Sequence, residues 1–333
     1  MQGILAYVLG RLLWLPVVLL IVTFFTFMIA RFGPGDPVTI LAGQHGDPET
    51  FERIRDELGL DKPFYHQYYI YMNNLITEGD FGESVTIYRG VKVRDIIWPR
   101  ILVSLQPGIV ALIIAFSLGT AVGVFAALRQ GTWMDPFSIS SFLFFQSVPV
   151  LVVLPILILI FVVRLDWLPA PGTWSGPQVD VGPQEISLGI FSRHIILPAL
   201  VLSLPGVAGV ARLVRATTLS VLGEDYVRTA RAKGLQERTV VVRHVVRNSL
   251  LPLVTIIGLS MATLLEGAFF TELILGIPGI GQLGFQAATS RDYDVILALV
   301  LILATAFIVA NIFIDIAYTF IDPRIRYQRQ DTG

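Results

Sequence analysis

Six stretches of this chain are apolar over the length that crosses a lipid bilayer as a helix, and this pattern restricts the fold more strongly than any other feature. The hydrocarbon core of a bilayer, about 30 Å thick, requires about 20 apolar residues in helical form. Hydrophobic residues make up 54% of the 333 residues and charged residues 15%, a composition that excludes a water-soluble globule. We therefore predict an all-α polytopic membrane protein with six transmembrane helices, at residues 12–30, 101–128, 136–163, 195–214, 250–275 and 295–321.

The first stretch is expected to remain as an anchor, and prolines are expected to interrupt other stretches. The stretch at 12–30 is longer than the apolar core of a signal peptide, and no small-residue cleavage site follows it, so we expect a retained anchor. Pro149, Pro155, Pro198 and Pro205 lie within predicted spans, where proline leaves backbone groups unpaired unless protein or water satisfies them. Kinked helices around a cavity fit this pattern, although prolines are also ordinary in membrane helices.

The distribution of charge predicts how the chain is oriented. Residues 212–248 contain eight basic and three acidic side chains, a net charge of +5, and Arg324, Arg326 and Arg329 follow the last span. Because Lys and Arg concentrate on the cytoplasmic side of membrane proteins, both regions are expected there, and six spans then place the N-terminus there too. Residues 33–98, with six basic and eleven acidic side chains, are expected outside.

The external segment is the only sizeable polar insertion, and we predict two helices in it. One covers 47–59, with a proline in its first turn, an apolar face and a final glycine. The other covers 64–75 and carries Tyr65, Tyr68, Tyr69 and Tyr71, which we expect in the core of a small helical cap or at the headgroup level. The Pro- and Gly-rich loop 164–193 shows no regular pattern.

The basic cytoplasmic segment predicts two helices joined by a turn. Glu224 and Asp225 complement the positive end of the first helix, Lys233 complements its negative end, and Gly234 can adopt the left-handed conformation that ends it. We expect Tyr226, Val227 and Ala230 to present a shallow surface for a groove in another protein. The alternative is a solvated loop that only sets the orientation of the chain. A second helix is expected from about residue 236 to 252.

Several motifs occur in one order along the chain and together resemble a known family. Segment 226–235, followed by RHVVRNSLLPL at 243–253, is similar to the cytoplasmic coupling motif of permease subunits in bacterial and archaeal ABC importers, in the peptide/nickel branch. Nearly the whole chain resembles the first permease of the pair in that branch, with one departure, Ile277, where the family usually has an aromatic residue. The other matching segments are PGDP at 34–37, LGLDKP at 58–63, GDFGES at 79–84, 272–281 ending in IPGIG, RDY at 291–293 and DPRIR at 322–326.

The resemblance implies a type I ABC importer permease with four regions. These are a cytoplasmic N-terminus with the first span (1–32), an extracytoplasmic helical insert (33–98), a permease core (99–323) with a coupling loop at 215–248, and a cytoplasmic tail (324–333). It also implies a multi-pass protein of the bacterial or archaeal inner membrane. The implied partners are a second homologous permease, two ABC ATPase subunits and an extracytoplasmic binding protein.

ATP and Mg are expected in the ATPase partners, and no cofactor or catalytic residue is expected here. A Walker A loop ends in Gly-Lys-Ser/Thr, whereas the only lysines, Lys62, Lys92 and Lys233, are followed by Pro, Val and Gly. The resemblance favours di- or oligopeptides as substrates, with glutathione-like peptides, nickel chelates or oligosaccharides as alternatives. A channel or a proton-coupled carrier is the more distant alternative, and its transport would not depend on an ATPase.

Two sets of candidate site residues follow. Ionisable groups inside spans are costly in lipid and usually face protein or water. Glu272 matches a family position beside the outer gate, where it either shapes the gate or pathway or makes a structural hydrogen bond to a neighbouring helix. Glu266, about 120° away around the helix, could face the pathway. The ATPase-coupling set is Tyr226, Val227, Arg228, Thr229, Ala230, Ala232, Lys233, Gly234 and Leu235, and the pathway or gate set is Glu266, Glu272, Pro278, Gly279 and Gln146.

Other site classes have little support in the sequence. The four histidines are scattered without metal-ligand spacing, so no metal site is predicted. Segment 279–284 fits G-x-G-x-x-G, but no βαβ unit surrounds it, which excludes a dinucleotide site. Nucleic-acid binding has no support beyond the basic loop. Gly119 and Gly123 form a G-x-x-x-G motif, which predicts close packing of two membrane helices.

Overall fold

The fold is a set of long helices with a helical projection at one end and a small insert at the other. The computed structural model describes residues 2–32, 49, 51–53, 61–181, 184–189, 192–250, 252–253, 256, 260 and 269–321. Four helices within these residues are long and apolar enough to cross a membrane. They are α1 (Gln2–Phe32), α5 (Val93–Leu128), α8 (Ile196–Leu222) and α15 (Tyr293–Ile321).

The predicted span 136–163 is broken rather than continuous. Helix α6 (Met134–Ser147) is followed by α7 (Val150–Leu157) and the π-helix η1 (Ile158–Arg164), and the two halves meet at an angle of 105°. The break falls at Pro149, and Val148 before it is extended, because proline disfavours the helical conformation in its predecessor. The predicted span is therefore interrupted at Pro149, one of the prolines expected to break it, and the predicted span 250–275 lies mostly outside the described residues.

Helices α5 and α8 pack against each other along most of their length. A Cβ atom added at Gly119 would lie 2.7 Å from Cβ of Val210, and one at Gly123 would lie 2.6 Å from the carbonyl oxygen of Ala211. No real Cβ tolerates such distances, so the two backbones approach this closely only because both positions are glycine. The predicted role of the G-x-x-x-G motif in helix packing is confirmed.

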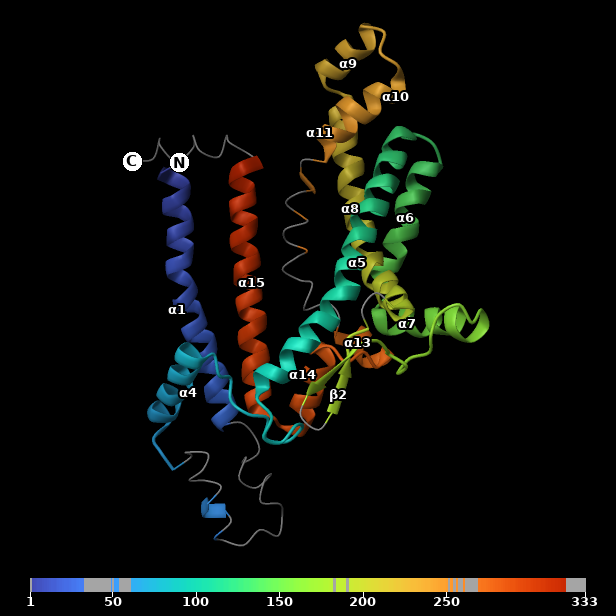
Figure 1. The fold of residues 1–333 in the computed structure, drawn as a ribbon. Coiled ribbons are helices and arrows are strands. Elements are labelled where there is room, and N and C mark those ends of the chain that lie inside the picture. The colour runs from blue at the N-terminus through green and yellow to red at the C-terminus, as the bar shows by residue number, and fades with distance from the viewer. Residues whose placement is uncertain are drawn as a thin grey trace.

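The two ends of the bundle carry different elements (Figure 1). Helix α9 (Asp225–Ala232) and the short helices after it project beyond α8, at the end where α1 begins and α15 finishes. We call this the loop end. Helix α4 (Phe64–Glu78), the strands and α14 (Ile280–Ser290) lie at the opposite end, called here the insert end. This arrangement agrees with the charge pattern, which predicts the basic loop and both termini on one side.

The insert packs on the core through aromatic side chains. Helix α4 confirms the predicted helix 64–75, and Gly79 ends it in the left-handed conformation with φ of 63°. Phe27 of α1 is fully buried against Phe64, Tyr68 and Tyr71, so part of the predicted aromatic core exists, whereas Tyr65 and Tyr69 are exposed. The predicted helix 47–59 lies mostly outside the described residues.

A second anchor of the insert is the buried carboxylate of Asp292, just before α15. It accepts hydrogen bonds from Ser84 Oγ at 2.6 Å, from Thr86 N at 3.0 Å and from Ile87 N at 3.1 Å. These donors belong to the insert, some 200 residues earlier in the chain. One carboxylate therefore ties the end of the insert to the start of the last span.

The loop after η1 contains a β-hairpin that the sequence pattern did not predict. Strands β1 (Gln178–Val181) and β2 (Gln184–Ser187) pair antiparallel, with Gln178 opposite Ser187. Val181 and Ile186 are buried in a cluster with residues of α5 and α14. The expectation that 164–193 lacks regular structure is wrong, because each strand is only four residues long and the core supplies the contacts that stabilise it.

The α5–α8 contact yields a stability test. Gly123→Ala should lower the thermal unfolding temperature of the purified protein by about 3 °C or more, since overpacking a close contact costs about 1–3 kcal/mol. Gly209→Ala on α8 is the matched control, because an added Cβ there meets no atom of the described residues within 4 Å. Both changes bring the same gain in helix propensity, so equal unfolding temperatures in the two variants would contradict the packing role.

Candidate functional site

The basic segment at the loop end folds as two helical pieces joined by a turn. Helix α9 begins after the extended residue Glu224, with Asp225 in its first turn and Arg231 in its last. Gly234 has φ of +74°, which confirms the predicted left-handed turn. The chain then continues through α10 (Glu237–Thr239), the π-helix η3 (Val240–Val246) and α11 (Arg247–Ser249), so the predicted second helix also exists.

The apolar face of α9 points into the chain itself. Val227 is 0% and Ala230 is 6% exposed, and both pack against Val240 and Val245 of η3. The prediction that these two residues face a groove of another protein is therefore wrong, because the second helix already covers the stripe they form. The exposed members of the predicted coupling set are Tyr226, Arg228, Thr229, Ala232, Lys233, Gly234 and Leu235.

Polar contacts hold α9 in a fixed position on the rest of the loop. Arg231 donates from Nε and Nη2 to the Glu237 carboxylate at 3.1 and 2.7 Å, and these hydrogen bonds lower the pKa of Glu237 below its usual value. Asn248 Nδ2 donates to the hydroxyl of Tyr226 at 3.0 Å. Together with the buried valines, these contacts join α9 to the helices that follow it. Val221 and Leu222 at the end of α8 pack on the same cluster, so α9 is also held against α8.

At the insert end, Glu272 is the centre of a buried hydrogen-bonded turn. It lies in α13 (Phe269–Leu275) and is 1% exposed. Its carboxylate accepts hydrogen bonds from Ser104 Oγ of α5 at 2.6 Å, from Gly281 N at 2.7 Å and from Gln282 N at 3.2 Å. Of the two roles considered for Glu272, the hydrogen bond to a neighbouring helix is confirmed, and the same carboxylate also caps the start of α14.

The turn between α13 and α14 contains the other predicted gate residues. A Cβ atom on Gly279 would lie 2.4 Å from the carboxyl carbon of Glu272, so only glycine lets the carboxylate reach the α14 amides. Ile277, the position that departs from the family pattern, is 1% exposed in a cluster with Val103 and Leu154. Pro278 lies between them and is partly buried. Glu272, Pro278 and Gly279 are thus one local structure at the insert end.

A second buried charge beside this turn was not predicted. Arg100 of α5 is 3% exposed and donates from Nη2 to the hydroxyl of Tyr88. The Tyr88 amide in turn donates to Ser84 Oγ at 2.8 Å, and Ser84 binds Asp292. The chain of contacts links the insert to α5, the helix that also supplies Ser104. A sequence signal existed, since Arg100 is a lone cation at the start of an apolar stretch, but its partners are distant in sequence.

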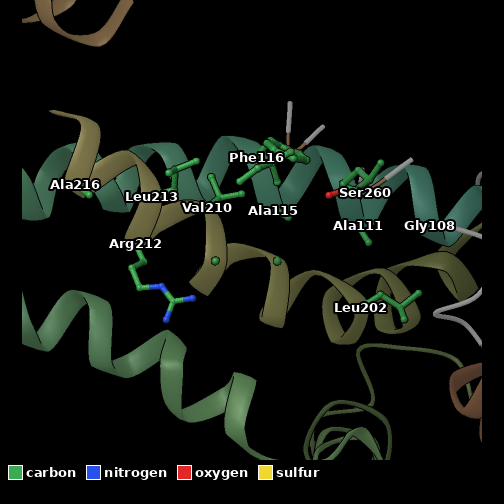
Figure 2. Close-up of a pocket in the computed structure, with 14 residues that line it drawn as sticks. Gly108, Ala111, Ala115, Phe116, Leu202, Val210, Arg212, Leu213, Ala216 and Ser260 are labelled. Atoms are coloured by element: carbon green, nitrogen blue, oxygen red, sulfur yellow. The ribbon is translucent and has the colours of Figure 1, made fainter. Parts of the chain in front are cut away.

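A cavity of about 660 Å³ lies between α5, α8 and the described residues Ile256 and Ser260 (Figure 2). Its walls are mainly small or apolar, with Ala111 and Ala115 on α5 and Gly206 and Gly209 on α8. Arg212 lies toward the loop end of the row of lining residues, near Ala216. Gln146 does not line this cavity and is exposed on α6, and Glu266 lies outside the described residues.

Two models of protein families match this chain. The model of the family described as binding-protein-dependent transport system inner membrane component matches residues 119–327, and the model of the N-terminal part of such components matches 4–88. The chain belongs to this family of transport permeases.

Curated relatives are similar over nearly the whole chain. A probable peptide ABC transporter permease of Sinorhizobium fredii is 36% identical over 321 residues, 96% of this chain and 99% of the relative. A dipeptide transport system permease of Alkalihalophilus pseudofirmus is 36% identical over 335 residues, 97% of this chain and 100% of the relative. A glutathione transport system permease of Escherichia coli is 38% identical over 322 residues, 97% and 99% of the two chains.

Membership in this family makes the chain a membrane-embedded transport subunit of an ABC importer. The larger family match contains the loop at 225–249, the α8 wall of the cavity and the turn with Glu272. Residues 89–118, between the two matches, contain Arg100 and Ser104, which hold the insert and the α14 turn on α5. The permease thus has one candidate site at each end and a cavity between them.

The Glu272 turn of this permease can be tested by amide hydrogen exchange. Glu272→Gln replaces a charged acceptor of backbone amides by a neutral one, and hydrogen bonds to charged groups contribute about 1.5–3 kcal/mol. Exchange of the Gly281 and Gln282 amides should become about tenfold faster or more, as measured by mass spectrometry. Glu185→Gln, at an exposed position of β2, is the control. Unchanged exchange at the α14 turn would show that the carboxylate does not hold it.

Proposed function

We propose that this chain is the permease subunit of an ATP-driven importer of peptides, and that it forms half of the translocation pathway. The observation that carries the proposal is the similarity over at least 96% of the chain to permeases named for peptide, dipeptide and glutathione transport. In this proposal a second homologous permease forms the other half, and an extracytoplasmic binding protein delivers di- or oligopeptides. Two ABC ATPase subunits bind ATP and Mg.

The proposed location is the inner membrane of a bacterial or archaeal cell, with the loop end in the cytoplasm. The net charge of +5 over residues 212–248 supports this orientation. The insert, with α4 and the Asp292 anchor, then lies outside, where a binding protein would arrive. The cavity between α5 and α8 is the proposed part of the passage that this subunit contributes.

We further propose that the exposed face of α9 is the surface on which the ATPase acts, within a coupling loop of residues 215–248. The exposed members of the coupling set, Tyr226, Arg228, Thr229, Ala232, Lys233, Gly234 and Leu235, form this surface. The buried pair Val227 and Ala230 has a different role, because it holds α9 on η3. Closure of the ATPases would move α9 as a rigid body, and the pathway would alternate between two states stabilised by different partner contacts.

The complete complex reconstituted in vesicles tests this function directly. Uptake of a labelled peptide should require the binding protein outside and ATP on the side of the ATPases. Equal uptake by permeases reconstituted without the ATPase subunits would contradict the proposal and would favour a channel or a carrier.

Gly234 provides the sharpest test of the coupling surface. Gly234→Val puts a β-branched residue at φ of +74°, a conformation that costs L-residues about 1–2 kcal/mol or more, so the turn after α9 must change. ATP-dependent uptake should be lost, while the amount of permease in the membrane stays near the wild-type amount. Gly131→Val is the matched control, since Gly131 has φ of +80°, open space around it and a place in the α5–α6 turn. Normal uptake by the Gly234 variant would rule out this turn as part of the coupling surface.

A further inference from the structure

Two arginines one helical turn apart on α8 have different surroundings. Arg215 forms a two-pronged ion pair with Asp135 of α6, from Nε to Oδ1 and from Nη2 to Oδ2. Asp135 is 6% exposed, so this pair joins the two helices inside the protein. Arg212, by contrast, has no hydrogen bond or ion pair with any residue that the structure describes, and its side chain is exposed. The charge of one arginine is neutralised within the chain, and that of the other is available.

Arg212 lies inside α8, near the loop end of the predicted span 195–214. Leu222, the last residue of α8, follows ten positions later, which corresponds to about 15 Å along the axis. A charged side chain within a membrane span is costly unless it pairs with another group or faces a water-filled space. Arg212 lines the cavity between α5 and α8 and its side chain is exposed, so its charge is not enclosed by apolar protein.

Arg212 differs in its charge from the other described residues that line the cavity. Among the lining residues that the structure describes, Arg212 is the only ionisable one, and Ser260 is the only other with a polar side chain. Small residues such as Ala111 and Gly209 leave room, and a volume of about 660 Å³ lies within the range of pockets that hold small ligands. Apolar walls of low dielectric strengthen the field of a single cation inside such a space.

We infer that Arg212 is a subsite in the passage for the carboxylate of the transported peptide, an inference that rests on the proposed function. A planar guanidinium binds a carboxylate through two parallel hydrogen bonds. Peptides differ in their side chains, but every unmodified peptide carries a C-terminal carboxylate. An apolar cavity with one fixed cation therefore accepts many sequences while it still binds the one charged group that they share. A peptide that enters from the insert end meets the small-residue walls first and Arg212 nearer the loop end (Figure 2).

The first experiment compares peptides with and without that carboxylate, using the complete complex with its binding protein and ATPases in vesicles. The probes are trialanine, trialanine amide and Ala-Glu-Ala amide. Arg212→Gln should reduce trialanine uptake about tenfold and leave trialanine amide uptake unchanged, and Arg212→Lys should retain part of the difference. Loss of Ala-Glu-Ala amide uptake as well would show that the subsite takes any carboxylate. The binding protein is the same throughout, so its own preference cancels in each ratio of variant to wild type.

Arg215→Gln is the matched control. It removes a cation from the same helix but breaks the pair with Asp135, so the amount of assembled permease should fall while the trialanine-to-amide uptake ratio stays at the wild-type value. Equal loss of both probes in the Arg212→Gln variant would overturn the inference, because it would indicate a general structural role.

A second measurement does not require delivery by the binding protein. The chain contains no cysteine, and Ala216, one turn from Arg212, lines the same cavity. In an Ala216→Cys variant, trialanine added at the loop end should slow modification by a membrane-impermeant maleimide, and trialanine amide should not. Adding Arg212→Gln should abolish this protection. Equal protection by the two peptides, or protection that survives Arg212→Gln, would overturn the inference.

Lipid phosphate could also pair with Arg212, and vesicle composition distinguishes this source of the anion. The effect of Arg212→Gln on the trialanine-to-amide ratio should be the same in phosphatidylcholine vesicles and in vesicles with phosphatidylglycerol. An effect present only with the anionic lipid would show that Arg212 binds a lipid headgroup and not the peptide, and would overturn the inference.

Failure of the subsite can be told from failure of the proposed function. If the wild-type complex imports none of the peptides, the proposed function fails, whereas peptide import with an unchanged ratio in Arg212→Gln refutes only the subsite.

Discussion

The close packing of α5 against α8 is the contact on which the other features of this permease depend. Gly119 and Gly123 bring the two backbones together at one level, where Val210 and Ala211 occupy the space that a Cβ would need. Farther along, Gly206 packs so closely on α5 that an added Cβ would lie 2.8 Å from Cβ of Ala115, and both residues line the cavity with Ala111 and Gly209. The same two helices therefore stay in contact along one wall of the cavity. Small residues serve both purposes, since they let the backbones approach and take up little of the cavity volume.

Each end of this helix pair carries one of the candidate sites. At the loop end, α8 leads into α9, which the valine cluster and the Arg231–Glu237 pair hold as one unit. At the insert end, α5 supplies Ser104 to the Glu272 turn and Arg100 to the insert. Contacts between packed helices thus connect α9 to the Glu272 turn. Transmission of a movement from one site to the other requires such a continuous series of contacts between packed elements.

The parts of the fold that follow from local pattern were predictable. Apolar length located the four long helices and the bent pair α6–α7, and the acidic, basic and glycine residues around 224–234 located α9 and its left-handed turn. The direction in which Val227 and Ala230 point was not predictable, because an apolar stripe does not say whether its partner is another protein or the next helix of the same chain. The hairpin at 178–187 and the contact of Arg100 with Tyr88 depend on tertiary neighbours for the same reason. The hydrogen bond of Glu272 to a neighbouring helix was one of two predicted roles, but its donor, Ser104, is 168 residues away and could not be identified from local pattern.

The treatment of charge within the protein connects these observations. Asp135 and Arg215 neutralise each other, Asp292 is surrounded by hydroxyl and amide donors, and Glu272 has three donors around its carboxylate. In each case a fixed group of the chain offsets the cost of removing a charge from water. Arg212 departs from this rule among the described residues of α8, and the cavity beside it explains how such a charge is tolerated. An exposed cation that the described residues do not pair is free to bind an anion and to release it, which a permanently paired cation cannot do.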